Sequence, residues 1–419
     1  MAEGSSPPPR HRDGFIATRK AELARAIVAE SGDGPAMQEL LKLLGALMHH
    51  EAHERLEALK ALYDPLDPDA PPARRDESVT AFEAFEAALV ETLGRANYVE
   101  IDPDTVQTRR QTKQLTGLSI KPSQAGIRSI RYFARGTRPE ELEHRSWFGL
   151  RRQKVAAEVM NDVVVLVGFK SESEIKGADR RVFANMRGLR PGAALAKHFR
   201  DVAGPELVTL HPGAKPSMRP RDQVFLAAPA IATGVPVLLN LWPALTVTFA
   251  VIAAYFGAQG AIDDDALKRA IAAVSGLVAV GAFVMRQRLK YEAQTLRYQK
   301  KLADTVYFRN LANNGGVLDL LVGAGEEQDV KEAFLAYAAL RRAGRPLTKA
   351  EIDRASEEFL RQCFGLQVDF DIHDALAKLE RLGLVSREGE AAYVALAPTE
   401  ALSRLDAAWD GLFHFSARR

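Results

Sequence analysis

The chain has 419 residues, of which 47% are hydrophobic and 26% are charged, and its formal net charge is +2. This length allows two or three domains, and the composition is that of a globular protein. A single cysteine, Cys363, excludes an internal disulfide and a cysteine-based zinc site, so we expect a reducing compartment.

The small net charge hides a segregation along the chain. Residues 109–221 carry 23 Lys and Arg against 10 Asp and Glu, whereas residues 317–419 carry 13 against 18. The opposite net charges of residues 109–221 and 317–419 predict that these parts have different surroundings, or that they attract each other.

The first 13 residues contain three consecutive prolines and no apolar core of a secretory signal, so we interpret residues 1–13 as a disordered tail. Residues 14–212 are expected to form an α+β soluble domain. Apolar residues recur at helical spacing in its first part, in the stretches 15–28, 37–48 and 79–96. The stretches 126–136 and 158–171 are rich in β-branched residues and bounded by turn residues, which predicts strands.

Basic residues gather near the end of this domain: Lys176, Arg180, Arg181, Arg187 and Arg190. We interpret this cluster as a binding site for anionic lipid headgroups. A contact with the acidic C-terminal domain and a plain solvated surface are the alternatives.

A membrane region is predicted over residues 213–290. Residues 224–262 contain no charged side chain over 39 positions. As one helix they would extend roughly 58 Å, whereas the hydrocarbon core of a bilayer is about 30 Å thick. A second apolar segment, 270–285, follows an acidic connection, so we expect a transmembrane helical hairpin. A buried hairpin in a water-soluble core is the alternative.

Neither apolar segment contains an ionisable side chain. Transporters and pumps usually need such residues within the membrane, so we expect an anchor. Basic residues flank the region on both sides: Lys215, Arg219 and Arg221 before it, and Arg286, Arg288 and Lys290 after it. Basic flanks favour the cytoplasmic face, which requires an even number of crossings. We expect two crossings with both soluble domains in the cytoplasm, and headgroup contacts from the second basic flank; three crossings would separate the domains.

A basic juxtamembrane helix and a turn are predicted for residues 291–316, and 322–327 is interpreted as a turn between helices. Residues 317–419 then give three helices and a β-hairpin, the order of a winged-helix domain. Thr348 and Glu351 form a capping box at the second helix, and Gly389 marks the turn of the hairpin. The third helix and its approach are net acidic, so we expect no nucleic-acid binding.

Two clusters are weak candidates for a metal site. Asp369, Asp371 and His373 offer oxygen and nitrogen ligands, although capping of the third helix by Asp371 explains the same positions. His49 and His53 lie one helical turn apart, but a solvated polar face explains them as well.

No phosphate-binding glycine loop, nucleophile elbow or dinucleotide fingerprint is present. We therefore expect no catalytic residue, no bound metal and no cofactor, and a metal-dependent hydrolase is only a third hypothesis. Cys363 has Phe359, Leu360 and Phe364 beside it and is expected to be a buried apolar residue.

The stretch 306–322 and the segments after it resemble the signature of the transmembrane protein 143-like family, which comprises uncharacterised membrane proteins built on a domain of unknown function. The resemblance extends from about residue 79, is sharp from residue 306 onward and is weak over 181–199. The matching positions are Tyr307, Phe308, Asn310, Asn313, Asn314, Lys331, Glu332, Tyr337, Asp369, Asp371 and Leu382. The resemblance implies a membrane location, mitochondrial in animals, and no established reaction.

The sequence therefore predicts a mostly helical α+β integral membrane protein that acts as a non-enzymatic scaffold or regulator. Its expected partners are the lipid bilayer, anionic headgroups and an unidentified protein. We expect it in the bacterial inner membrane, or in an organellar inner membrane if the source is eukaryotic. A membrane-tethered winged-helix transcription regulator is the alternative function.

Overall fold

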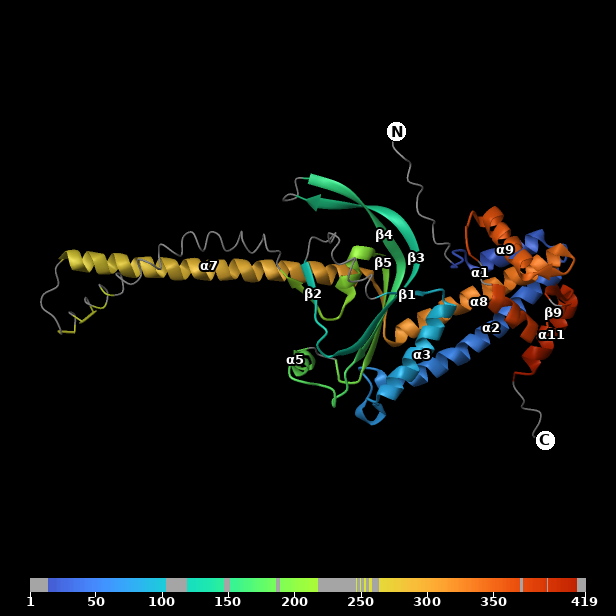
Figure 1. Cartoon of the computed structure of the whole chain (residues 1–419), viewed down its shortest axis with the longest axis horizontal. Helices are drawn as coiled ribbons and strands as arrows, with labels where there is room; N and C mark the ends of the chain where they lie inside the picture. Colours follow the sequence, from blue (N-terminus) through green and yellow to red (C-terminus); the bar gives the residue numbers. More distant parts are fainter. Residues whose placement is uncertain are drawn as a thin grey trace.

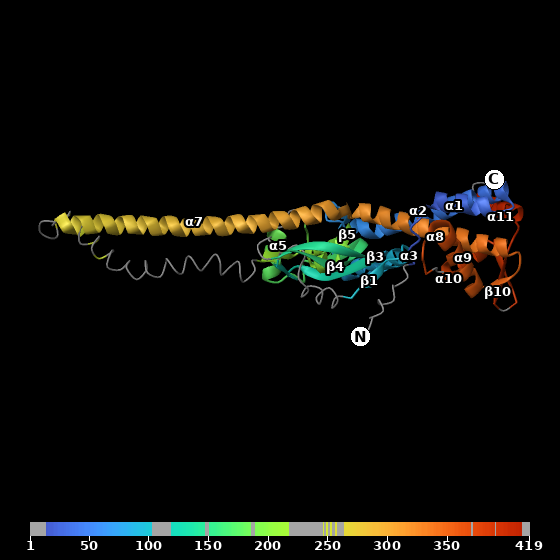
Figure 2. The same ribbon diagram turned by 90° about the horizontal axis from the view of Figure 1, so that it is seen from above.

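A computed structural model describes residues 14–102, 119–146, 151–185, 189–217, 264–369, 372–389 and 391–412, together with residues 246, 249, 252, 253, 256 and 257. The chain is mostly helical with antiparallel sheets, as expected. It is elongated: a helical body lies at one end, a curved sheet lies in the middle, and one long helix projects from the other end (Figures 1 and 2).

The central sheet has five antiparallel strands in the order β1-β3-β4-β5-β7. The strands are β1 (Val99–Ile101), β3 (Ile127–Ser146), β4 (Arg151–Phe169), β5 (Ala194–Ala203) and β7 (Asn310–Asn313). The two strands expected from the sequence correspond to β3 and β4, which pair with each other and run further than predicted. Apolar residues of β4 alternate between the two faces, so each face of the sheet has its own core.

Three helices cover one face of this sheet: α3 (Val79–Arg95), the second half of α2 (Gly34–Tyr63) and the beginning of α8 (Gly315–Ala343). The apolar stripe predicted for α3 is buried, with Phe85 and Leu89 fully covered. Phe82 approaches β4 so closely that a Cβ atom on Gly168 would lie 2.5 Å from its ring. Glycine at this position therefore allows α3 to seat on the sheet.

The opposite face is covered by smaller elements. They are the 3-10 helix η3 (Gly204–Leu210), α5 (Ala178–Asn185) and the last turns of α7 (Asp264–Arg309). The short strands β2 (Ser119–Pro122) and β6 (Ala214–Ser217) pair beside η3. Val163, Phe199 and Leu207 lie at the centre of this core.

The C-terminal body has its helices and hairpin in the expected order. After α8 come β8 (Leu347–Thr348), α9 (Lys349–Phe364), α10 (Ile372–Arg381), β9 (Val385–Glu388), β10 (Ala392–Ala395) and α11 (Pro398–Asp410), with the sheet order β8-β10-β9. The predicted capping box is confirmed, since Glu351 accepts hydrogen bonds from both the backbone and the side chain of Thr348. The predicted turn is confirmed at Gly389, whose φ is 70°.

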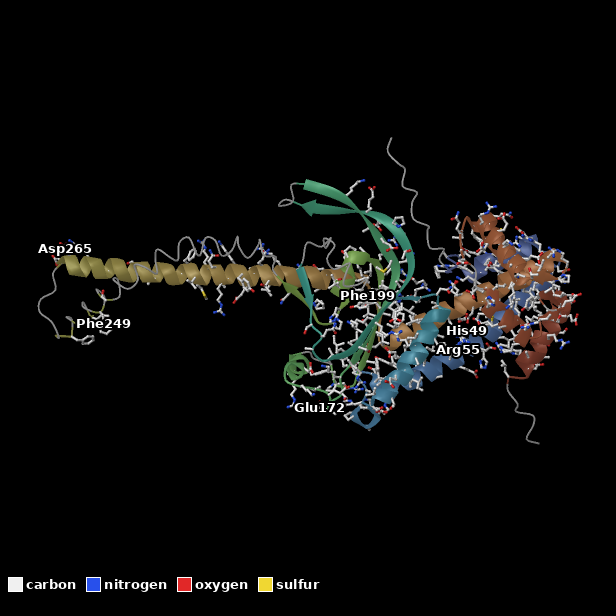
Figure 3. The ribbon with its side chains drawn as sticks, viewed as in Figure 1. His49, Arg55, Glu172, Phe199, Phe249 and Asp265 are labelled. Carbon is white, nitrogen blue, oxygen red and sulfur yellow. The ribbon has the colours of Figure 1, made fainter. Side chains whose placement is uncertain are left out.

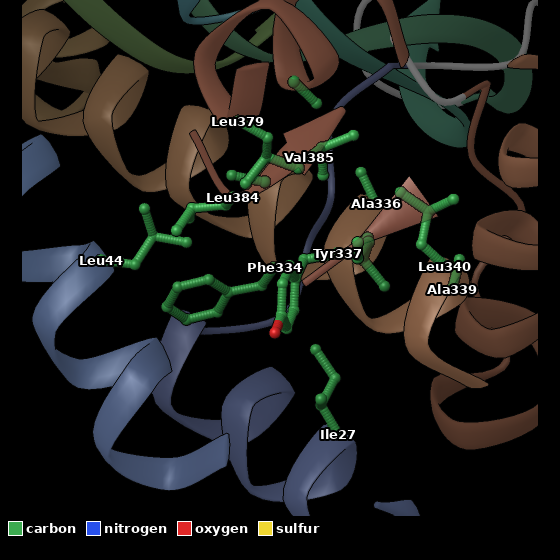
Figure 4. Packing of buried hydrophobic residues seen from close by; sticks show 14 of the residues in the cluster. Ile27, Leu44, Phe334, Ala336, Tyr337, Ala339, Leu340, Leu379, Leu384 and Val385 are labelled. Carbon is green, nitrogen blue, oxygen red and sulfur yellow. The ribbon is translucent and has the colours of Figure 1, made fainter. Parts of the chain in front are cut away.

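This body shares its core with the N-terminal helices. α1 (Lys20–Glu30) and the first half of α2 pack against α8, α10 and α11. Figure 4 shows Phe334 and Tyr337 of α8 near Leu44 and Ile27, which come from α2 and α1. The hydrophobic cores thus cross the expected division between residues 14–212 and 317–419. Because α2 and α8 each run through two cores, they join the sheet and the C-terminal body into one unit.

The turn predicted at residues 322–327 is wrong. These residues belong to α8, which is continuous over 29 residues. The glycines that suggested a turn lie within the helix and are not required by close packing: a Cβ on Gly323 would meet no atom within 4 Å, and one on Gly325 would lie at an ordinary contact distance of 3.6 Å from Cβ of Arg95. Tertiary contacts of α8 override the low helix propensity of glycine.

The second apolar segment and the basic stretch after it form one uninterrupted helix, α7, of 46 residues. Within the part of the chain that the structure describes, no helix is long and apolar enough to cross a lipid bilayer. Most of the first apolar segment, 224–262, lies outside the described residues, and so does the tail 1–13. The transmembrane hairpin therefore stays a prediction.

Candidate functional site

The projecting half of α7 exposes large apolar side chains. Ile271, Val278, Val284 and Met285 are between 56% and 66% exposed. Figure 3 shows Asp265 at the tip of this helix, far from Phe199 in the sheet near its base. Among the residues that the structure describes, no hydrophobic core covers this apolar helix surface.

A basic segment follows directly on the same helix. Arg286, Arg288 and Lys290 are all exposed, and Arg288 donates a hydrogen bond to Glu292 at 3.0 Å. The change from apolar to basic surface therefore lies between Met285 and Arg286, where the sequence placed it.

The basic cluster of the sheet domain does not form one surface. Lys176 and Arg180 are exposed, and Arg181 belongs to α5, while Arg187 lies outside the described residues. Arg190 is buried, and its guanidinium donates to the backbone carbonyls of Pro65 and Asp67 at 2.7 and 2.9 Å. The expectation that Arg190 contacts lipid headgroups is therefore wrong. Its side chain is buried and hydrogen-bonded to the loop after α2, which it holds against the end of the sheet domain.

The predicted metal candidates do not converge. Asp369 and His373 are exposed, and Nδ1 of His373 lies 3.0 Å from Nζ of Lys349, while Asp371 lies outside the described residues. Among the residues described, no three His, Cys, Asp or Glu side chains are placed to hold a metal ion.

The other histidine pair is also separated by its contacts. Nδ1 of His49 lies 2.8 Å from Oε2 of Glu326 in α8, and His53 is exposed. His49 is thus part of the contact between α2 and α8.

The expectation that Cys363 is buried is wrong. The thiol is exposed, and its Sγ lies 3.4 Å from a carboxylate oxygen of Glu30. Partial burial and this neighbouring carboxylate raise the pKa of the thiol, which opposes a role as a nucleophile.

Five of the residues that carried the family resemblance lie where α7 joins the sheet. Tyr307 and Phe308 are 76% and 81% exposed and contact each other edge to face. Asn310 and Asn313 lie in β7, and Nδ2 of Asn310 donates to the side chain of Asn313 at 3.0 Å. Asn314 adopts a positive φ of 52° before α8, and its backbone N–H donates to the carbonyl of Ala196 at 2.7 Å.

The sheet holds a buried polar network that was not predicted from the sequence. Asp162 of β4 accepts a hydrogen bond from Arg135 of β3 at 2.8 Å and lies 3.2 Å from Nε2 of His198 of β5. The hydroxyl of Tyr98 is 3.1 Å from the same nitrogen. The signal available was the single acid within the apolar stretch of β4, because a buried carboxylate requires partners.

These partners determine the ionisation of the network. Burial acts to raise the pKa of Asp162, but hydrogen bonds from His198 and Arg135 outweigh it and lower the pKa to about 2. Arg135 also stacks between the rings of Phe15 and Tyr98, at 4.3 and 4.7 Å from their centroids. The network therefore holds a permanent ion pair that fixes the N-terminal segment over the sheet.

A second charged cluster joins α8 to its neighbours. Asp329 is 2% exposed, and its Oδ1 forms an ion pair with Nζ of Lys378 in α10 at 2.7 Å. Arg55 of α2 and Arg95 of α3 lie 3.6 and 3.8 Å from its other oxygen. Burial acts to raise the pKa of Asp329, and Lys378 opposes this rise only in part. Asp329 thus stands where α2, α3, α8 and α10 meet.

The same stretch of α8 binds the N-terminal segment. Lys331 is 2% exposed and donates to the carbonyls of Ile16 and Thr18 at 2.7 and 3.0 Å. Gln328 pairs with the backbone N–H of Ile16 at 3.1 Å. Burial lowers the pKa of Lys331 to about 8. These contacts attach residues 14–18 to the junction of the two cores.

Three comparisons with known proteins add one finding. Residues 160–316 match the model of a family described as a protein of unknown function (DUF3754). No curated protein and no solved structure matches the chain. The matched region includes residues 181–199, where the resemblance was expected to be weak, and ends before most of the stretch where it was expected to be sharp. Nothing in the match ties the chain to the transmembrane protein 143-like family.

Proposed function

We propose that this chain is an integral membrane protein in which residues 224–285 form the anchor, and that it acts as a non-enzymatic scaffold or regulator. The observation that carries the proposal is the apolar surface of the projecting half of α7. Exposing apolar area to water costs about 25 cal/mol per Å², and a contiguous apolar surface on a soluble protein usually marks a contact. A bilayer would cover this surface over residues 270–285, and the uncharged stretch 224–262 precedes it in the chain.

The packing of the folded body supports two crossings. Because α1 and α2 share a core with α8 and α10, we infer that the parts of the chain before and after the membrane region lie on the same side. A chain that leaves this body near residue 217 and returns along α7 has to cross the bilayer an even number of times. The basic flank at Arg286 favours the cytoplasm for that side.

Membrane integration can be tested by alkaline carbonate extraction of full-length protein. Val278 is 66% exposed and lies within the apolar segment, whereas Leu296 is 63% exposed on the same helix but outside it. An aspartate at the centre of a membrane helix costs about 3 kcal/mol. We expect Val278→Asp to increase extraction and Leu296→Asp to leave it unchanged. Complete extraction of the unsubstituted chain, followed by monodisperse behaviour without detergent, would exclude the anchor.

Sidedness can be tested with reporter fusions after Arg221, Asp264 and Arg288, which should give inside, outside and inside. Cross-linking with a carbodiimide, which joins a lysine directly to a carboxylate, gives an independent test. Lys60 precedes the membrane region and Asp319 follows it, and Nζ of Lys60 lies 2.8 Å from Oδ1 of Asp319. We expect this α2–α8 cross-link in intact membranes and its loss in Asp319→Asn. Reporters that place the two bodies on opposite faces would contradict the proposal.

The element order of the C-terminal body favours a membrane-tethered winged-helix regulator as a second candidate. The basic residues of α10 argue against it, because Lys378 is paired with Asp329 and Asp374, and Arg381 with Glu51. They are thus engaged within the protein rather than available to phosphates. Salt-sensitive, sequence-preferring gel shifts by the detergent-solubilised chain would favour this candidate, and their absence would eliminate it.

A further inference from the structure

A cavity lies where α7 meets the sheet. Its volume is about 400 Å³, and its apolar wall comes from the face of β4 and β5 opposite α3, including Val165, Val167 and Phe199. Val306 and Ala303 of α7 close the side facing the long helix. All the lining residues belong to the region 160–316 that matches the uncharacterised family.

Lys197 is an unusual member of this lining. It lies in β5 and is only partly exposed, and its ammonium group makes no hydrogen bond or ion pair with any residue that the structure describes. Burial among apolar neighbours lowers the pKa of its ammonium group. A cation in such surroundings is costly unless an anion accompanies it.

His211 lines the same cavity and is 94% buried, since its exposed fraction is 6%. Its Nδ1 accepts a hydrogen bond from the backbone N–H of Gly213 at 3.0 Å, so this nitrogen carries no proton. The proton of the neutral ring therefore sits on Nε2, which is a buried donor without an acceptor among the described residues. Burial lowers the pKa of His211, which keeps the ring neutral at pH 7.

We propose that this cavity binds a small anionic amphiphile, a carboxylate with an unbranched apolar body, whose two oxygens accept hydrogen bonds from Lys197 and Nε2 of His211. The apolar wall then covers the body of the ligand. At about 30 Å³ for each water-sized group, the cavity has room for roughly a dozen non-hydrogen atoms, which is the size of decanoate. Gln299 and Ala303 are exposed at its edge and leave an entrance beside α7. The inference stands independently of membrane anchoring.

The test is titration of full-length protein with decanoate labelled with ¹³C at the carboxyl carbon. Decanol tests the need for the charge, and decyl phosphate distinguishes a carboxylate site from a general anion site. We expect decanoate to bind at least tenfold more tightly than decanol and than decyl phosphate. Lys197→Met should weaken decanoate binding at least tenfold.

The matched control is Lys300→Met, which removes an exposed lysine of α7 next to the entrance. It should leave decanoate affinity unchanged, whereas a general attraction of anions to this basic surface would weaken both variants equally. Lys197→Met removes a partly buried charge, so its melting temperature without ligand should be equal to or above that of the unsubstituted chain. Equal affinity for decanoate and decanol, or unchanged binding in Lys197→Met, would overturn the proposal.

Discussion

At the scale of single residues, the chain places its most buried charges at the contacts between elements. Asp162 joins three strands, and Asp329 joins four helices. Sequence patterns could not have identified these pairs, because the partners are distant along the chain. The single acid within the apolar stretch of β4 indicates that Asp162 needs a partner, but not which residue supplies it. The sequence did predict the local chemistry of caps and turns, such as Thr348 with Glu351, because those interactions involve neighbours.

Asp162→Asn should destabilise the protein by about 3–5 kcal/mol, because it leaves the guanidinium of Arg135 buried without its counter-charge. The control is Asp201→Asn, which removes a 2.8 Å ion pair with Arg138 at the exposed side of the same sheet. Solvent screens that pair, so its loss should cost less than about 1 kcal/mol. Chemical denaturation of both variants measures the difference, and equal costs would contradict a structural role for the network.

Acid should weaken the same network. The pKa of Asp162 is about 2 in the folded protein and 3.8 in an unperturbed aspartate. Its contribution to stability is therefore complete above pH 4 and is lost as the pH falls from about 4 toward 2. The slope of unfolding free energy against pH in this window should be smaller in Asp162→Asn, and an unchanged slope would exclude this titration as its cause.

At the scale of elements, helices with a strong apolar period were predictable, and α3 has the buried stripe that its spacing indicates. Two features were not. β7 has only four residues, Asn310–Asn313, and pairs with a strand more than one hundred positions earlier, so no local signal marks it. The glycines of α8 resemble a turn in sequence, but the helix continues through them, because the apolar residues before them are buried in the core that α8 shares with α2 and α3.

Gly168→Ala should cost about 1–3 kcal/mol, because the added methyl group would lie 2.5 Å from the ring of Phe82 and force α3 away from β4. Gly94 is the matched control: it lies in α3 with no atom within 4 Å of an added Cβ. Gly94→Ala should stabilise the helix by up to about 1 kcal/mol. Thermal melting of both variants gives the comparison, and a neutral Gly168→Ala would show that α3 can shift without penalty.

At the scale of the whole molecule, the charge segregation suggested that the basic middle of the chain meets its acidic end. The structure describes a different pairing. Acidic residues of α8 bind cations from α1, α2 and α3, among them Glu326 with Lys20 and Asp319 with Lys60. Net charge along a sequence does not specify which individual residues meet, because tertiary packing brings together residues that are distant in the chain.

Unfolding of the sheet and of the C-terminal body should be a single cooperative transition, since α2 and α8 pass through both cores. Lys378→Met leaves Asp329 without its closest partner and should lower the stability of both bodies together by about 3–5 kcal/mol. Hydrogen exchange would show this as a parallel loss of protection in β4 and α10. Two separate transitions in calorimetry would contradict the coupling.

The connection from α7 through β7 to α8 has a mechanical consequence. A straight helix of 46 residues is roughly 69 Å long. The end of α7 at Arg309 leads directly into β7, which pairs with β5, and then into α8, which runs through the C-terminal body. A tilt of about 10° at that end would sweep the tip through roughly 12 Å, by the same helical rise. Conversely, a force on the tip of α7 would act on the edge strand β7. The force would therefore reach α8 at the place where the two cores are joined.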